Sequence, residues 1–454
     1  MRVLSRAVRP KTVTSPLLAL LFLAACTAPP ADRPASIPVS TAAPESKAPA
    51  PSPSPAPQAP AAPPETPPPS PLIEALTQAV KAKPDDGPLL YFLASLHAER
   101  ADKKAALERL EQLAALRYPY ALQKTDFARI AHDPDYQDVA ARIAQNEPSV
   151  SRSAAAFTLP EKDLIPEGIA HDPQTNTFYV GSIHKRKIVA FKEGKAPRDF
   201  APEAKDGLLA VLGLKVDTKR GRLFAASISS KGMKGYTPDA AGRSALFEFD
   251  LRTGDVVRKV FLGSPSEAHL LNDLAVTRAG DVYVTDSDAG AVHVLRRGAD
   301  KLEVLVPAQS FSYPNGIALS GDEKYLFVAH FRGIARVDPK TGQFTPMAAA
   351  SGIVLGGIDG LSLYKNGFVA VQNSIGRARV TRYFLDAELG RVEREDILES
   401  KNALFDAIPT TGVLSGAAFY YIANSQLRAL NEAGQLAPES ELREPQVLKV
   451  TLAH

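Results

Sequence analysis

Residues 314–319 (PNGIAL) and 325–328 (YLFV) contain the pattern that decides the fold. A polar residue and a glycine open a short apolar run, a polar turn follows, and a second apolar run comes after the turn. Two short apolar runs separated by turn residues predict a pair of antiparallel strands.

The same pattern recurs along the C-terminal two thirds of the chain. Its other copies start at residues 167 (EGIA), 212 (LGLKV), 272 (NDLAV), 359 (DGLSL) and, in a weaker form, 411 (TGVL). Successive copies start roughly 40–60 residues apart, which is the period of a four-stranded propeller blade. The sequence therefore predicts a mainly β fold, a six-bladed β-propeller over residues 157–454. Residues 157–159 and 447–450 are expected to share one blade and close the ring, which removes an exposed sheet edge.

The position of the pattern within a blade makes it chemically informative. The first strand of each blade lines the central channel, so the residue that opens it lies at one mouth of that channel. In four copies this residue is Glu167, Asn272, Asn315 or Asp359. All-oxygen ligands suit a hard divalent cation, calcium most naturally. Two carboxylates also balance the charge of one such ion.

Second strands are expected to end at the same mouth. His330 ends one of them and is a candidate catalytic residue, because an unperturbed imidazole pKa of ~6.5 suits proton transfer. The alternative for His330 is a hydrogen-bonded histidine at a strand end, and His269 has a similar claim. Asp273, Asp286 and Asn373 are expected to support the ligands, with Asp286 orienting Asn272 or a metal-bound water.

Four motifs resemble the metal-site motifs of the regucalcin/gluconolactonase family and of its relatives, the paraoxonases. They are Glu167-Gly168, Leu271-Asn272-Asp273, Pro314-Asn315-Gly316 and Asp359-Gly360. Family members bind one catalytic divalent ion, commonly calcium, and many hydrolyse lactones or organophosphate esters. The resemblance implies that Glu167, Asn272, Asn315 and Asp359 are metal ligands and that Asp359 is the general base.

The chain departs from the family pattern at three positions. Leu270 replaces an arginine of the regucalcin-like enzymes, Leu212 replaces a catalytic histidine of the paraoxonases, and Gly168 replaces an aspartate that binds their second calcium. Two functions therefore stay open. One is a metal-dependent hydrolase of a lactone or related ester, and the other is a non-catalytic metal-binding propeller that serves as a scaffold for a small ligand or a protein.

The N-terminal residues read as a targeting segment. Residues 17–25 (LLALLFLAA) are too few to span a bilayer, which needs ~20 apolar residues, so residues 1–25 are predicted to be a signal peptide. The run ends in LAAC at Cys26, which resembles a bacterial lipobox and implies lipidation of Cys26. Thr27 in place of an aspartate implies an outer-membrane lipoprotein facing the periplasm. The expected location is thus the cell envelope, with the membrane reached through the lipid anchor only.

Two more segments separate this anchor from the propeller. Residues 26–71 are dominated by Pro, Ala, Ser and Thr and are predicted to be a disordered linker. Residues 72–150 show helical periodicity, with apolar residues three and four apart over 89–96 and 107–116, and resemble one tetratricopeptide repeat. Two further short helices are predicted over 121–131 and 136–145. The role expected for this module is spacing or partner binding.

Composition limits the remaining choices. The chain has 454 residues, of which 45% are hydrophobic, so it can form more than one core. Its net charge is only +3, which argues against nucleic acid as a partner. Its single cysteine excludes a disulfide within the chain. The sequence leaves the oligomeric state open.

Overall fold

The computed structural model describes residues 71–118, 122–123, 125–146, 149–264, 266–374 and 377–452. The predicted signal peptide, Cys26 and residues 27–70 of the predicted linker lie outside these residues. Among the described residues, no helix has the length and apolar character needed to cross a membrane.

The helical segment contains α2 (Pro71–Ala82), α3 (Gly87–Glu99), α4 (Lys103–Ala115) and α5 (Pro134–Asn146). Asp86 and Asp102 cap α3 and α4, since their carboxylates accept from the backbone N–H groups three residues later at 3.1 and 3.2 Å. The apolar spacing predicted for these two helices is confirmed, because Leu90 and Leu110 are fully buried.

The helix predicted over 136–145 is confirmed as α5, but the helix predicted over 121–131 is wrong. Residues 125–131 form turns. Tertiary contacts replace helical ones there: Phe127 is fully buried, and the Tyr91 hydroxyl donates to Asp126 at 2.6 Å and accepts from the Gln123 N–H.

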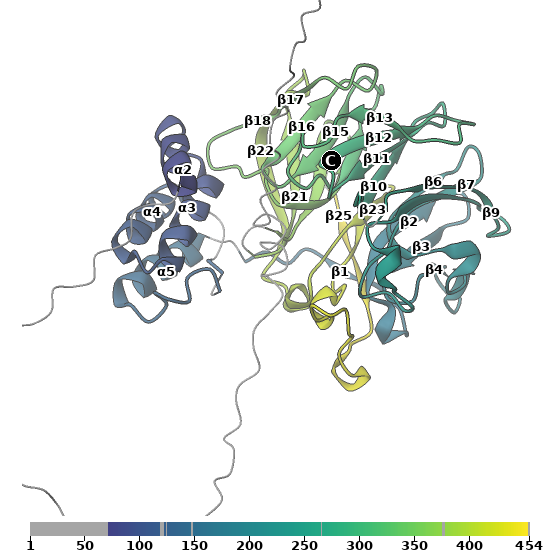
Figure 1. The fold of residues 1–454 in the computed structure, drawn as a ribbon, viewed down its shortest axis with the longest axis horizontal. Coiled ribbons are helices and arrows are strands. Elements are labelled where there is room, and N and C mark those ends of the chain that lie inside the picture. Colours follow the sequence, from purple (N-terminus) through teal and green to yellow (C-terminus); the bar gives the residue numbers. More distant parts are fainter. Residues whose placement is uncertain are drawn as a thin grey trace, which may run out of the picture. The chain divides into compact units, whose positions relative to one another are not determined.

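The rest of the described chain forms the predicted six-bladed β-propeller, with one antiparallel sheet for each blade (Figure 1). Blade one contains β2 (Pro166–Asp172), β3 (Thr177–Ser182), β4 (Lys187–Phe191) and β5 (Arg198–Ala201), and blade two contains β6 (Ala210–Asp217), β7 (Arg222–Ile228), β8 (Ser244–Asp250) and β9 (Val256–Leu262). Blade three contains β10 (Leu271–Val276), β11 (Val282–Asp286), β12 (Ala291–Leu295) and β13 (Glu303–Val306), and blade four contains β14 (Ile317–Leu319), β15 (Leu326–His330), β16 (Gly333–Val337) and β17 (Phe344–Pro346). Blade five contains β19 (Ile358–Leu363), β20 (Gly367–Gln372), β21 (Arg379–Leu385) and β22 (Arg391–Ser400), with β18 (Ala348–Ala349) added in parallel. Blade six contains β23 (Gly412–Ser415), β24 (Ala418–Ile422), β25 (Gln446–Thr451) and β1 (Ala154–Thr158).

The ring closes in blade six as predicted. Strand β1 from the start of the propeller pairs with β25 from its end, with Phe157 opposite Val447. The innermost strands β2, β6, β10, β14, β19 and β23 each contact the next one around the ring, and β23 contacts β2. Each blade therefore places the first residues of its inner strand beside those of its neighbours.

Side chains of the second strands hold neighbouring blades together. Phe327 packs into the core shared with blade five, whereas Leu326 and Val328 pack into the core shared with blade three. Successive residues of a strand face opposite sides of the sheet, so one apolar run can supply two cores. This arrangement explains why these strands are apolar throughout.

The glycines of the repeated pattern allow the inner strands to approach closely at the mouth. A β-carbon at Gly168 would lie 1.8 Å from the carbonyl oxygen of Leu212, and one at Gly316 would lie 2.6 Å from that of Asp359. Both distances are shorter than van der Waals contact allows. The pattern thus combines a polar residue at the mouth with a glycine that lets the inner strand of the neighbouring blade pack closely against it.

Candidate metal centre at the channel mouth

The four predicted ligands lie on four blades at the same level of the channel. Glu167, Asn272 and Asp359 stand at the starts of the inner strands β2, β10 and β19, and Asn315 comes just before β14. Asn315 Nδ2 donates to Asp359 Oδ1 at 2.8 Å, which joins blades four and five. The side chains of Glu167, Asn272 and Asp359 are buried.

Three carboxylates lie within reach of one another's charge. Burial raises the pKa of Asp359 to about 7, against hydrogen bonds from Asn373 and Asn315 that lower it, and the charge of Asp273 raises it further. Burial, followed by the charges of Asp359 and Asp273, raises the pKa of Glu167 well above its usual range. Burial also raises the pKa of Asp273. A cation among these groups would offset both their desolvation and their mutual repulsion.

Amide and hydroxyl groups fix the oxygen donors in place. Asn373 donates to the second oxygen of Asp359 and, at 2.8 Å, to the Pro409 carbonyl. Asn272 Nδ2 donates to Ser287 Oγ at 3.0 Å, and that hydroxyl donates to the Pro314 carbonyl at 2.6 Å. A side-chain amide carries an acceptor oxygen beside its donor nitrogen, so Asn272 can make this bond and still present an oxygen to an ion.

Asp273 links blade three to blade four. Its carboxylate accepts from the Leu274 N–H at 2.8 Å and from the Ile317 N–H at 3.3 Å. Across the ring, the Thr410 hydroxyl donates to the Glu167 carbonyl at 2.9 Å. These bonds hold the mouths of adjacent blades in register.

The contacts of Asp286 differ from those predicted for it. Asp286 accepts from His269 Nδ1, from His293 Nε2 at 3.1 Å and from the Leu270 N–H at 3.0 Å, while Ser287 makes the contact to Asn272. The orienting role expected for Asp286 toward Asn272 thus falls to Ser287.

His330 packs against an aromatic ring. Its imidazole stacks on Phe311 with ring centroids 5.3 Å apart, and its Nδ1 accepts from the Arg332 N–H at 3.3 Å. Burial lowers its pKa to about 4, and the charge of Arg332 contributes. His330 is therefore neutral at neutral pH. Within the described part of the chain, no hydrogen bond or ion pair joins it to the carboxylates.

Sequence reasoning missed two residues of the mouth, Tyr313 and Asp288. Burial raises the pKa of Tyr313, as do the charges of Asp288, Asp359 and Glu167, so its phenol lies close to the carboxylates and stays protonated. Its φ of +52° is unusual for a residue other than glycine. A residue before proline normally adopts an extended backbone, so the sequence carried no signal for this position.

An apolar cluster accounts for two departures from the family pattern. Leu212 and Leu270 pack together with Ile165, Met233 and Tyr236. Ile165 and Leu270 each precede a predicted ligand by two residues. The positions that carry an arginine or a histidine in the related families thus belong here to a mostly buried apolar cluster beside the oxygen donors.

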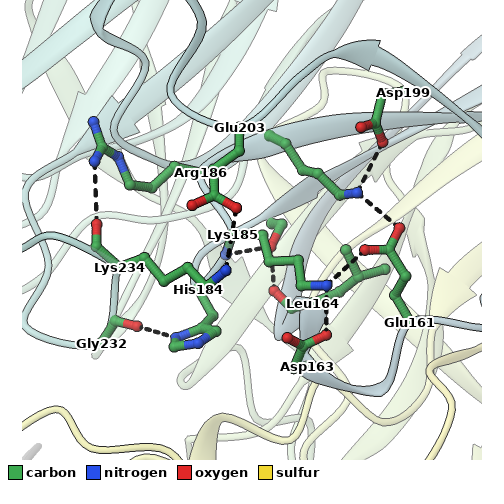
Figure 2. A network of polar contacts seen from close by, with 12 residues as sticks. Glu161, Asp163, Leu164, His184, Lys185, Arg186, Asp199, Glu203, Gly232 and Lys234 are labelled. Carbon is green, nitrogen blue, oxygen red and sulfur yellow. Dashed lines mark hydrogen bonds and ion pairs between the residues drawn. The ribbon is translucent and has the colours of Figure 1, made fainter.

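A separate polar network follows the end of β3 in blade one (Figure 2). Lys185 pairs with Glu161 and Asp163 at 2.8 Å each, and His184 Nδ1 lies 2.7 Å from the Gly232 carbonyl. A cavity of about 450 Å³ lies beside it, lined by Pro160, Glu161, Lys162, Asp163, Lys185, Leu436, Ala437, Glu439 and Leu442. This lining contains none of the oxygen donors at the channel mouth, and the paired charges indicate that the network fixes the loop before β2.

Comparisons with known sequences leave the family open. No protein-family model matches the chain. The uncharacterized protein YncE of Salmonella typhi is 23% identical over 202 residues, covering 37% of this chain and 55% of that protein. YncE of Salmonella typhimurium is 24% identical with the same coverage. The chain thus spans little more than half the length of these curated relatives.

Solved structures with a similar fold include several enzymes. A gluconolactonase from Xanthomonas campestris is 14% identical, covers 67% of this chain and 98% of its own, and gives a TM-score of 0.43. A luciferin-regenerating enzyme is 14% identical, with 66% and 95% coverage and a TM-score of 0.44. An aldose sugar dehydrogenase from Streptomyces coelicolor is 11% identical, with 66% and 99% coverage and a TM-score of 0.44. Likeness at this level concerns the fold and carries no functional argument.

Proposed function

We propose that the protein is a divalent-metal-dependent hydrolase of a lactone or related ester, with calcium as the metal. The observation that supports the proposal is that Glu167, Asn272, Asn315 and Asp359 stand at the starts of inner strands that pack around the channel, with Asn315 bonded to Asp359. Four protein oxygens fit calcium, which takes six to eight oxygen ligands, and leave places for water and substrate. The bound ion would supply Lewis-acid polarisation of the substrate oxygen and acidification of a water.

The chain's own residues supply the remaining chemistry. Asp359 is the proposed proton acceptor, held by Asn315 and Asn373 so that its carboxylate cannot rotate. Tyr313 keeps its proton near Glu167 and Asp359, so it would donate a hydrogen bond to a substrate oxygen. His330 is the alternative acceptor, because its low pKa keeps it neutral, although its contacts lie with Phe311 and Arg332.

The apolar cluster around Leu212 and Leu270 supports a choice of substrate within this class. Leu270, a partly buried member of this cluster two residues before Asn272, favours a lactone or ester with an alkyl or aryl group over a polyhydroxylated sugar lactone, whose hydroxyls would lose hydrogen bonds there.

One observation favours a non-catalytic scaffold as the second candidate function. Both oxygens of Asp359 already accept an amide N–H, from Asn315 and from Asn373. A carboxylate held in this way is well placed to bind an ion and less free to accept a proton. In this second function, the ion would stabilise the propeller, and a small ligand or a protein would bind its face.

We also propose that Cys26 carries a lipid and holds the protein at the outer membrane, facing the periplasm, with residues 27–70 as a tether. The helical module, whose sequence resembles one tetratricopeptide repeat, would serve as a spacer or bind a partner. Mass spectrometry of the membrane-extracted protein tests the lipid on Cys26, and a Cys26→Ala variant should appear in the soluble fraction.

An assay of the purified chain separates the two functions. A panel of alkyl lactones, a sugar lactone and aryl esters is measured with calcium and with a chelator, for the wild type and for Asp359→Asn. If the protein is a hydrolase, we expect calcium-dependent turnover, and Asp359→Asn should lower it by about 100-fold or more, the range expected for a lost general base. Full activity with the chelator would exclude the metal-dependent mechanism, and calcium binding without turnover would favour the scaffold.

A further inference from the structure

A second group of potential metal ligands lies in blade three, apart from the four oxygen donors. It consists of His269 just before β10, Asp286 at the end of β11 and His293 in the middle of β12. One ligand atom from each residue lies within 4.8 Å of the other two. Both imidazoles contact the same carboxylate oxygen, His293 through Nε2 at 3.1 Å and His269 through Nδ1.

The backbone fixes this oxygen in its position. Asp286 is fully buried, and its other oxygen, Oδ1, accepts from the Leu270 N–H at 3.0 Å and the Ala289 N–H at 3.2 Å. The carboxylate therefore cannot rotate away from the two imidazoles. Oδ2 is therefore the carboxylate oxygen that would bind an ion together with the two ring nitrogens.

His293 is the more deeply buried of the two histidines, with 4% of its surface exposed. Its Nδ1 has no hydrogen-bond partner among the described residues. The hydrogen bond that the structure gives this buried ring is thus made through Nε2, toward Asp286. Nε2 is thus the ring nitrogen that His293 presents to an ion shared with Asp286 and His269.

Negative charge accumulates around the group. Asp288 lies two residues beyond Asp286 and is exposed. The carboxylate of Glu267 comes within 3.7 Å of His269 Nε2, on the side of the ring away from Asp286. A divalent ion bound to neutral imidazoles would offset the charges of Asp286 and Asp288, and Glu267 could accept from His269 as an outer partner.

We propose that His269, Asp286 and His293 form a second metal site, for Zn²⁺ or a similar transition ion. Two imidazoles and one carboxylate are a donor set that zinc prefers, whereas calcium prefers oxygen alone. Of the three side chains, that of His269 is the most exposed, at 10%, and a water would be the fourth ligand. The site is independent of the proposed hydrolase activity.

Cobalt is the probe that tests the proposal, because Co²⁺ in a four-coordinate site absorbs visible light and Zn²⁺ does not. The chelator-treated full chain is titrated with Co²⁺, and Zn²⁺ or Ca²⁺ is added afterwards. We expect one equivalent of Co²⁺ to give visible bands that Zn²⁺ abolishes and Ca²⁺ leaves unchanged. His269→Gln should weaken binding by more than the roughly 10–100-fold that loss of an outer partner costs.

Two controls locate the ion. His184→Gln changes a histidine at a strand end of blade one and should keep the bands, and Glu167→Gln changes the oxygen site and should keep them as well. His293→Ala should lose the bands, with circular dichroism to confirm folding, and His269→Gln serves if that variant does not fold.

Two results would overturn the second site: no visible bands in the folded wild type, or bands unchanged in His269→Gln and His293→Ala. The three residues would then form a hydrogen-bonded group only. Cobalt binding at these residues in a protein that binds no calcium would contradict the proposed function and leave the second site standing.

Discussion

Asn315 donates a hydrogen bond from Nδ2 to Asp359 Oδ1 at 2.8 Å, across the boundary between blades four and five. The two residues are 44 positions apart in the sequence, yet each opens the inner strand of its own blade. The contact shows how the propeller assembles a site from residues that share a position in the repeat. It also makes the geometry of one proposed ligand depend on the other.

Replacement of Asn315 tests this dependence. Asn315→Leu removes a proposed ligand and a donor to Asp359, so the pKa of Asp359 should rise further and calcium should bind at least ~10-fold more weakly, as for a lost supporting partner. Isothermal titration calorimetry measures the affinity. Asn366→Leu, in the turn before β20, is the matched control and should leave calcium binding unchanged. An unchanged affinity in Asn315→Leu would exclude it as a ligand.

The stability of the metal-free protein should fall as the pH rises. The folded-state pKa of Asp359 is raised from 3.8 to about 7 by burial, so its contribution to stability is complete below about pH 4 and is lost as the pH passes through about 7. Thermal unfolding of the chelator-treated protein between pH 5 and 8 should show a falling Tm. Asp359→Asn removes this titration and should flatten the curve.

Calcium should reverse that dependence. The ion binds the deprotonated carboxylates, so the rise in Tm on adding calcium should be larger at pH 8 than at pH 5. A calcium effect of equal size at both pH values would mean that the ion binds elsewhere than at Glu167 and Asp359.

Gly168 should not tolerate a side chain. Its β-carbon would meet the Leu212 carbonyl oxygen at 1.8 Å, so Gly168→Ala must push two inner strands apart, at a cost of at least about 1–3 kcal/mol. Chemical denaturation measures the change. Gly321→Ala is the control, because a β-carbon there meets no atom within 4 Å. Equal stability of the two variants would contradict the close approach at the mouth.

Two substitutions compare the candidate proton acceptors. In the calcium-dependent assay, Asp359→Asn should lose about 100-fold in kcat or more. His330→Gln should keep most of the activity, since the contacts of His330 are a stacked ring and a backbone N–H. The opposite ranking, with His330→Gln the more damaging change, would make His330 the base.

The sequence predicted the features that repeat. Asn315-Gly316 and Asp359-Gly360 recur at the spacing of a blade, and because the inner strands run in the same direction along the channel, the first residue of each copy lies at the same mouth. Ring closure, with Phe157 opposite Val447, was also predicted, because apolar runs at both ends of the propeller could share one blade and remove an exposed sheet edge.

Features that arise from single contacts were not predictable. The group of His269, Asp286 and His293 forms because three strands of one blade end or pass side by side, and none of the three belongs to a repeated motif. Tyr313 enters the mouth through a left-handed backbone that its sequence context disfavours. In the helical segment, the bond from Tyr91 to Asp126 and the burial of Phe127 replaced the helix predicted over 121–131.

Calcium binding to the chelator-treated chain, measured by calorimetry with Glu167→Gln beside the wild type, tests the central claim most directly. The account predicts one calcium ion per wild-type chain at the channel mouth, and binding weakened by at least ~10-fold in Glu167→Gln, because a carboxylate ligand becomes neutral. A wild type that binds no calcium, or a Glu167→Gln variant that binds it as tightly, would contradict the account.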